Sequence, residues 1–254
     1  MAEITGIAWT DSTFNPWIGC TKVGPGCDHC YAEALDKRHR WGGATHWGSG
    51  VARKRTGEAY WRQPLGWNRK AAASGRPWRV FCASLADVFD NEVPEQWRAD
   101  LWDLIALTPS LTWLLLTKRI GNAAKMLHPW RANPLRNVWL GATIVNQEEA
   151  DRDVPKLLAT PAAVRFVSYE PALGPVDWSK FPGIDWIIVG GESAQGGKPR
   201  PFFLSWAQDT IGMARAIGAA PFVKQLGSGR GLKDRAGADP AEWPIYLRVQ
   251  EFPA

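Results

Sequence analysis

Three of the four cysteines of the chain lie within eleven residues, at Cys20, Cys27 and Cys30. Glycines and a proline are interleaved with them in the segment TFNPWIGCTKVGPGCDHCY, residues 13–31. Such a segment can turn sharply enough to bring three sulfurs toward one place. Cysteine thiolates are ligands for soft metal ions and for iron–sulfur clusters. The segment therefore predicts a metal site with these three cysteines as ligands.

The spacing leaves the kind of metal open. A structural zinc site needs four ligands, and with a single C-x2-C pair His29 or His39 would have to complete it. A four-iron cluster on three cysteines leaves one iron open for chemistry. Cys82 stands alone in an apolar run and is expected to be a buried core residue. The cysteines favour an iron–sulfur cluster over zinc, with thiols that bind no metal as a third alternative.

An open iron is the arrangement of radical S-adenosylmethionine (SAM) enzymes, whose usual spacing is C-x3-C-x2-C, against C-x6-C-x2-C here. The chain resembles the phage-associated three-Cys-motif family, a branch of that superfamily that shares the wider spacing. The resemblance runs from about residue 9 to 227 and is carried by NPWIGCTKVGPGCDHCYAE, VFCASLADVF, LLLTKR, VWLGATIVNQ, RFVSYEPALGPV, WIIVGGESAQGGKPRP and PFVKQLG. It implies a [4Fe-4S] cluster, SAM bound to the open iron and cleaved to a 5′-deoxyadenosyl radical, and a partner protein.

Apolar runs alternate with helical patterns along the chain. Strands are expected at 13–19, 78–84, 111–117, 138–144, 164–169, 184–190 and 221–224, and helices at 31–40, from about 94, at 147–158 and at 205–217. This alternation predicts a parallel sheet with right-handed crossovers. Six or seven units predict a partial or closed (β/α) barrel of the TIM-barrel type, as the superfamily resemblance also implies, with a doubly wound open sheet as the alternative. The barrel is expected to span residues 1–226, with a basic insertion at about 36–79 and a loosely packed tail at 227–254.

Polar residues and glycines that follow the expected strands are candidates for a cofactor pocket, because parallel barrels build their sites at the carboxyl ends of strands. Glycine lets backbone approach a ligand, carboxylates accept from ribose hydroxyls or an ammonium, and lysine holds a carboxylate. The Gly-Gly-Glu triplet resembles the superfamily's motif for the SAM amino group, although it follows the sixth expected strand rather than the second. The candidates are Ser84, Asp87, Lys118, Thr143, Asn146, Glu170, Gly190, Gly191 and Glu192.

The net charge of +5 is spread unevenly. Between residues 36 and 79, eleven Lys and Arg stand against two acidic residues, so this segment carries +9 and the remainder −4. Four tryptophans, Trp41, Trp47, Trp61 and Trp67, lie among these cations. Cations with aromatic planes are typical of nucleic-acid binding. The segment predicts a nucleic acid or nucleotide substrate held by Arg53, Lys54, Arg55, Arg62, Arg69 and Lys70, and a solvated surface without a ligand is the alternative.

Other features narrow the class of protein. The amino terminus lacks a basic region followed by an apolar run, and no segment approaches 18 apolar residues, so we expect a cytoplasmic protein away from membranes. No P-loop, dinucleotide fingerprint or Ser-His-Asp spacing occurs. The sequence predicts a radical SAM type of enzyme acting on a nucleic acid or nucleotide. The alternatives are a zinc-stabilised nucleic-acid-binding module without catalysis and a non-catalytic subunit of a two-protein phage system.

Overall fold

The centre of the fold is a sheet of seven strands, each parallel to its neighbours. The computed structural model describes residues 5–127, 134–194 and 197–253. Across the sheet the strands are β1 (Ser12–Thr13), β4 (Trp78–Cys82), β5 (Leu111–Thr117), β6 (Val138–Thr143), β7 (Val164–Tyr169), β8 (Trp186–Gly190) and β9 (Ala220–Gln225).

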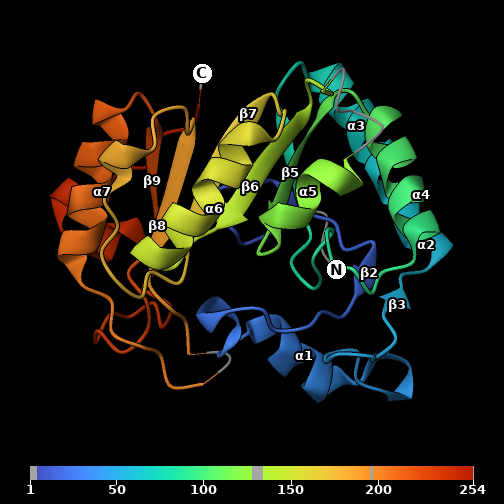
Figure 1. Ribbon diagram of the computed structural model, residues 1–254, viewed down its shortest axis with the longest axis horizontal. Coiled ribbons are helices and arrows are strands. Elements are labelled where there is room, and N and C mark those ends of the chain that lie inside the picture. The colour runs from blue at the N-terminus through green and yellow to red at the C-terminus, as the bar shows by residue number, and fades with distance from the viewer. Residues whose placement is uncertain (1–4, 128–133, 195–196, 254) are drawn as a thin grey trace.

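The strands are ordered in the sheet as they are in the chain, and Figure 1 shows this order for β5 to β9. Every crossover therefore moves in one direction and places its helix on one face, whereas a doubly wound sheet needs a reversal of strand order. In the described part of the chain, no pairing joins β1 to β9. The fold is a partial, open (β/α) barrel, which confirms the predicted partial barrel and excludes the closed barrel and the doubly wound sheet.

The outer face of the sheet is covered by helices. They are α3 (Gln63–Ser74), α4 (Glu95–Ala106), α5 (Ile120–Met126), α6 (Gln147–Ala159) and α7 (Leu204–Ala216). In α4 the residues Leu101, Leu104 and Ile105, whose spacing puts them on one face of the helix, are buried in the main core cluster. Cys82 is also buried there, as expected. None of the described helices is long and apolar enough to cross a membrane.

The inner face of the half barrel is filled by a second apolar cluster. Alternate residues of successive strands point inward and meet Trp9 there. Gly141 has no side chain because the ring of Phe166 occupies that space, within 2.3 Å of where a Cβ would lie. Rings and aliphatic chains thus close the inner face toward the amino ends of the strands. The cluster consists of Trp9, Phe81, Leu114, Phe166, Trp186, Ile188 and Phe222.

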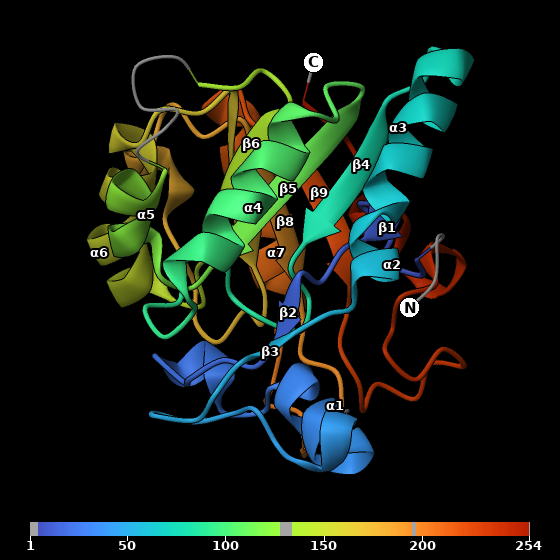
Figure 2. The ribbon, with the colours of Figure 1, turned by 90° about the vertical axis from the view of Figure 1, so that its right-hand side faces the viewer.

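The segment from Cys20 to Cys30, called the cysteine segment below, and helix α1 (Tyr31–His39) lie beyond the carboxyl ends of the strands, as Figure 2 shows. A small antiparallel pair, β2 (Trp17–Ile18) with β3 (Lys54–Arg55), and helix α2 (Glu58–Trp61) connect this region to the sheet. The expected first strand, 13–19, is split into β1 and β2 around Pro16, which lacks the N–H needed to continue a ladder. Short 3-10 helices are η1 (Pro25–Cys27), η2 (Trp41–Gly43), η4 (Trp178–Lys180), η5 (Pro240–Glu242) and η6 (Ile245–Leu247).

Residues 41–77, whose lack of a sustained period predicts a long loop with short helical pieces, contain the three-turn helix α3. Pro64 lies in its first turn, Trp67 and Ala71 are buried four residues apart, and Gly75 caps its end with a left-handed backbone. The helix is longer than the short helical pieces expected, because the cations and glycines of this segment conceal its short buried stripe.

The carboxyl-terminal segment, expected to be a loosely packed tail, is part of the core. Trp243 and Leu247 are buried, and Val223 of β9 donates its N–H to the carbonyl of Val249 at 2.8 Å. Trp186 also donates its Nε1 hydrogen to the carbonyl of Glu251 at 2.9 Å. The segment therefore covers the outer edge of β9, which would otherwise expose unpaired backbone groups.

Candidate functional site

One cavity of about 610 Å³ lies inside the half barrel at the carboxyl ends of the strands. Trp9, Phe81 and Leu116 supply its apolar part, and polar residues that follow several strands supply the rest. Cys20, Cys27 and Cys30 line the same cavity. The polar lining includes Ser84, Asp87, Lys118, Arg119, Thr143, Ser168, Glu170, Lys224 and Gln225.

The change from apolar to polar lining follows from the period of the strands. Side chains two residues apart point to the same face. Ser168 and Glu170 therefore follow Phe166 on the inner face of β7, and Lys224 follows Phe222 on β9. At the ends of β7 and β9 the inward side chains are therefore polar and the earlier ones apolar, so this part of the cavity is polar above an apolar floor.

The cysteine segment supplies thiols from three local structures: Cys20 from a loop, Cys27 from η1 and Cys30 from the position that precedes α1. Among the described residues, no three His, Cys, Asp or Glu side chains form a group that could hold a metal ion. Each iron of a cluster takes a thiolate of its own, so the ligands of a cluster do not meet at a single point as those of one ion do. The three thiols are donors of the type that an iron–sulfur cluster uses, and they lie along one cavity without forming a ligand group among the described residues.

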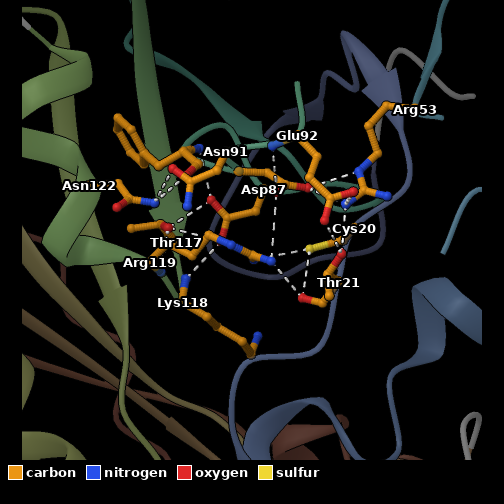
Figure 3. A network of polar contacts seen from close by, with 12 residues as sticks. Cys20, Thr21, Arg53, Asp87, Asn91, Glu92, Thr117, Lys118, Arg119 and Asn122 are labelled. Atoms are coloured by element: carbon orange, nitrogen blue, oxygen red, sulfur yellow. Dashed lines mark hydrogen bonds and ion pairs between the residues drawn. The ribbon is translucent and has the colours of Figure 1, made fainter. Parts of the chain in front are cut away.

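Cys20 has the most polar surroundings of the three cysteines, and Figure 3 shows them. Nη1 of Arg119 donates to the Cys20 sulfur at 3.3 Å, and Nη2 donates to the carbonyl of Thr21 at 2.7 Å. Burial, and after it the charge of Asp87, raise the pKa of the Cys20 thiol to about 12, while Arg119 opposes the shift. Cys20 is therefore a thiol near neutral pH unless a metal displaces its proton.

Asp87 lines the cavity, but its carboxylate is already engaged. It accepts hydrogen bonds from the Thr117 hydroxyl at 2.7 and 2.9 Å, from the N–H of Lys118 at 3.0 Å and from the N–H of Phe89 at 2.9 Å. These bonds join the loop after β4 to the end of β5. Asp87 therefore fixes the shape of the cavity wall.

Arg53 was predicted to bind a polyanion, and the structure contradicts this. Its side chain is 0 % exposed, and Nη2 lies 2.8 Å from the Asp90 carboxylate. Nη2 also donates to the Thr21 hydroxyl at 2.7 Å, while Nη1 donates to the carbonyls of His46, Gly48 and Val51. All of its donors are used inside the protein, so the guanidinium joins Thr21 to Asp90 and to the backbone of residues 46–51.

The other predicted polyanion-binding residues do not form one surface at the cavity. Arg55 pairs with Asp100 at 2.8 Å and lies over the ring of Trp61, and Arg62 pairs with Glu58 at 3.2 Å. Lys54 is half-buried. Arg69 and Lys70 are exposed on α3, which leads back to the amino end of β4 and so away from the cavity. Of the four tryptophans, Trp67 is buried in the core and is removed as a stacking surface, and Trp47 lines the cavity.

Glu192 lies outside the lining of the cavity and joins the cysteine segment to the end of β8. Its carboxylate accepts two hydrogen bonds from the guanidinium of Arg200, at 2.6 and 3.1 Å, and lies 2.9 Å from Nδ1 of His29. Arg200 also donates to the carbonyl of Pro25 at 3.0 Å. Burial alone would raise the pKa of Glu192, but the hydrogen bonds from Arg200 and His29 outweigh it and lower the pKa.

The remaining candidates for the cofactor pocket also lie outside its lining. Asn146 caps α6 by accepting from the N–H of Glu149 at 2.9 Å. A Cβ on Gly190 would lie 2.6 Å from Oε1 of Glu170, and one on Gly191 would lie 2.7 Å from the carbonyl of Leu226. These glycines allow parts of the protein to pack closely. Neither His29 nor His39, the candidates for a fourth zinc ligand, lines the cavity, and His39 stacks on Trp41 with ring centroids 5.2 Å apart.

Within the described part of the chain, three polar side-chain atoms are buried around the cavity without a hydrogen-bond partner, and of their residues the sequence singled out only Thr143. They are Nε1 of Trp9 and the hydroxyls of Thr13 and Thr143, and all three residues line the cavity. Lys224, another lining residue, pairs with Glu170 at 2.9 Å. The inward alternation along the strands could have identified Thr13 and Ser168, whereas Trp9 precedes the first strand and has no such signal.

Comparison with known proteins places the chain in a family. The family described as "Protein of unknown function (DUF5131)" matches residues 4–241. The chain belongs to this DUF5131 family. A search of curated proteins finds no match for this member. Among solved structures, the DUF5131 chain is similar to a mutant spore photoproduct lyase with bound AdoMet and dinucleoside spore photoproduct, at 12% identity and a TM-score of 0.44. The similarity covers 84% of the DUF5131 chain and 55% of the lyase chain, so the chain spans about half the lyase's length.

Proposed function

We propose that this protein is an iron–sulfur enzyme of the radical SAM type that acts on a nucleic acid or nucleotide. Cys20, Cys27 and Cys30 hold a [4Fe-4S] cluster, and SAM binds in the neighbouring cavity. The observation that carries the proposal is that all three cysteines line the cavity into which the ends of the parallel strands project. Bound together, the two groups supply radical chemistry that begins with reductive cleavage of SAM.

The cavity suits an amphiphilic, zwitterionic cofactor. Its volume lies within the usual range of about 300–1,000 Å³ for small-molecule sites. Lys118 is an exposed cation at the rim that can hold a carboxylate, and Glu170 can accept from an ammonium. The unpartnered Nε1 of Trp9 and the hydroxyl of Thr143 supply hydrogen bonds that the protein itself leaves unused. A polar ligand that met these groups would relieve the cost of burying them.

A polyanionic substrate is supported by the cations that remain exposed beside the cysteine segment. Arg38 and Arg40 are exposed at the end of α1, next to the stacked rings of His39 and Trp41. Helix α1 starts directly after Cys30, and nine residues span about 13 Å. A nucleic acid strand that follows α1 could contact these cations while one of its nucleotides reaches the cavity.

The cluster is tested by anaerobic reconstitution of the purified protein. We expect about four irons per chain and a brown protein, with the iron lost in Cys27→Ala. Cys82→Ala is the matched control, because Cys82 is buried in the core and does not line the cavity, so this variant should keep its iron. Colourless protein with one zinc per chain would overturn the proposal in favour of the zinc-stabilised binding module.

Catalysis is tested separately by adding SAM and dithionite to the reconstituted protein. Formation of 5′-deoxyadenosine supports the enzyme. Iron without cleavage favours the alternative of a non-catalytic subunit that works with a partner protein.

Substrate binding is tested with a fluorescent single-stranded oligonucleotide. We expect the double variant Arg38→Gln/Arg40→Gln to bind more weakly. Its affinity should also depend less steeply on salt concentration, because a protein with fewer phosphate contacts releases fewer counterions on binding. Arg69→Gln/Arg76→Gln is the control, because these exposed cations lie on and after α3, toward the amino end of β4. Equal loss in both double variants would show a general charge effect and no site at α1.

A further inference from the structure

We propose that Arg119 is a positioning residue for the Cys20 sulfur and raises the reduction potential of a cluster bound there. The inference rests on the proposed function, because it assigns to Arg119 a part in the metal site. Its basis is a hydrogen bond from a charged donor to one of the three cysteine sulfurs.

The geometry directs the guanidinium at the cysteine and its neighbour. Nη1 of Arg119 is 3.3 Å from the Cys20 sulfur, and Nη2 is 2.7 Å from the carbonyl of Thr21. The planar group thus spans two successive residues with two parallel donors, which fixes its orientation. Its side chain is 9 % exposed, so little water competes for these donors.

Acidic residues behind the guanidinium hold it in place, as Figure 3 shows in part. Arg119 lies 3.6 Å from the Asp87 carboxylate and 3.8 Å from that of Asp90. The Thr117 hydroxyl donates to Asp87 and accepts from the backbone N–H of Arg119 at 2.8 Å. Side chain and backbone of Arg119 are therefore both fixed by the end of β5 and the loop after β4.

Arg53 supports the same arrangement from the other side of Thr21. It donates to the Thr21 hydroxyl at 2.7 Å and shares Asp90 with Arg119. Thr21 is consequently held at its carbonyl by one arginine and at its hydroxyl by the other. Cys20, the preceding residue, has little freedom to move its sulfur away from Arg119.

Hydrogen bonds to ligand sulfurs are one of the factors that set the potential of an iron–sulfur cluster. A cationic N–H draws negative charge from the sulfur and stabilises the reduced cluster, which carries one more electron. Within the described residues, the sulfurs of Cys27 and Cys30 receive no comparable bond from a side chain. Arg119 therefore acts on one ligand out of three, and its removal should change the potential without removing a ligand.

The test compares Arg119→Gln with Arg200→Gln in anaerobically reconstituted protein. Both arginines fasten the cysteine segment to a strand end, but Arg200 binds Glu192, Asp28 and the Pro25 carbonyl instead of a sulfur. We expect a more negative midpoint potential in Arg119→Gln and the wild-type potential in Arg200→Gln. Arg119→Lys, which keeps the charge and loses the paired donors, should fall between them, and it replaces Arg119→Gln if that variant does not fold.

A metal-free measurement separates the failure of this inference from the failure of the proposed function. In a double-mutant cycle followed by urea unfolding, Arg119→Gln and Cys20→Ala should be non-additive, whereas Arg200→Gln and Cys20→Ala should be additive. Wild-type protein that takes up no iron contradicts the proposed function, and the cycle then decides alone whether Arg119 holds the sulfur. Additivity in both cycles, or an unchanged potential in Arg119→Gln, overturns the role of Arg119.

Discussion

Replacing Arg53 by Gln distinguishes a structural arginine from a substrate-binding one. The sequence places Arg53 within a cationic segment and predicts that its replacement by Gln, together with Lys54 and Arg55, weakens polyanion binding. The structure buries its guanidinium completely, beside Asp90 and three backbone carbonyls. The structure therefore predicts a less stable protein with unchanged intrinsic affinity for polyanions.

The magnitude follows from what the substitution leaves behind. Gln cannot reach all the partners of the guanidinium, so the ion pair that Asp90 retains among the described residues is the more distant one with Arg119, at 3.8 Å. Removing one partner of a buried ion pair costs about 3–5 kcal/mol. At about 2–4 °C per kcal/mol for a chain of this size, the melting temperature should fall by roughly 6–20 °C.

Urea and thermal unfolding of the metal-free protein measure this loss. Arg62→Gln is the control, because Arg62 is exposed and pairs only with Glu58 one helical turn away, so its loss should stay below about 0.5 kcal/mol. Oligonucleotide affinity is measured in the same two variants below their melting temperatures. Equal stability of the two variants, together with weaker binding by Arg53→Gln, would refute the structural role.

Three further predictions concern Thr143 in the cavity, the Glu192 carboxylate that binds Arg200 and His29, and Gly141 in the apolar inner face of the sheet. Thr143→Val removes an unpartnered buried hydroxyl, so unfolding of the ligand-free protein should occur at the same or a higher temperature, while calorimetry should show weaker SAM binding. The pKa of Glu192 is lowered in the folded protein, so its contribution to stability is present above the ordinary glutamate pKa and is lost as the pH falls through the folded-state pKa. The difference in unfolding free energy between wild type and Glu192→Gln should therefore shrink on acidification. A difference that stays constant with pH would contradict this. Gly141→Ala should destabilise the fold by about 1–3 kcal/mol in urea unfolding, because the ring of Phe166 occupies the space of the new methyl group, whereas Gly66→Ala on α3 has open space and should be neutral or stabilising.

Much of the fold could be predicted because it depends on local periodicity. The strands at 111–117 and 164–169 match β5 and β7, and the stripe on α4 is buried as its spacing indicates. Continuous apolar runs require burial on both faces of the sheet, so their parallel arrangement followed from the sequence. The full length of α3 and the packing of the terminal segment were not predicted, because each buries only a few residues against distant parts of the chain.

The candidate site was predictable to the extent that it lies at strand ends. Glu170 and Thr143 line the cavity because inward side chains recur every second residue. Glu192 follows a strand equally well, yet it pairs with Arg200 and His29 outside the cavity. Arg200 lies only eight residues further along the chain, but His29 comes from a distant segment, and a single sequence does not reveal which partner a carboxylate will meet.

The sequence by itself determined the spacing of the three cysteines, the alternation of strands and helices and the position of the polar strand ends, since each depends on residues close together in the chain. Only the tertiary structure decided which charges are available. Arg53 and Arg62 have the same side chain and lie nine residues apart, but one is enclosed by Asp90 and Thr21 and the other faces water. Burial and pairing depend on what the folded chain places opposite a residue, and this sets both the cost of removing it and the ligands that it can bind.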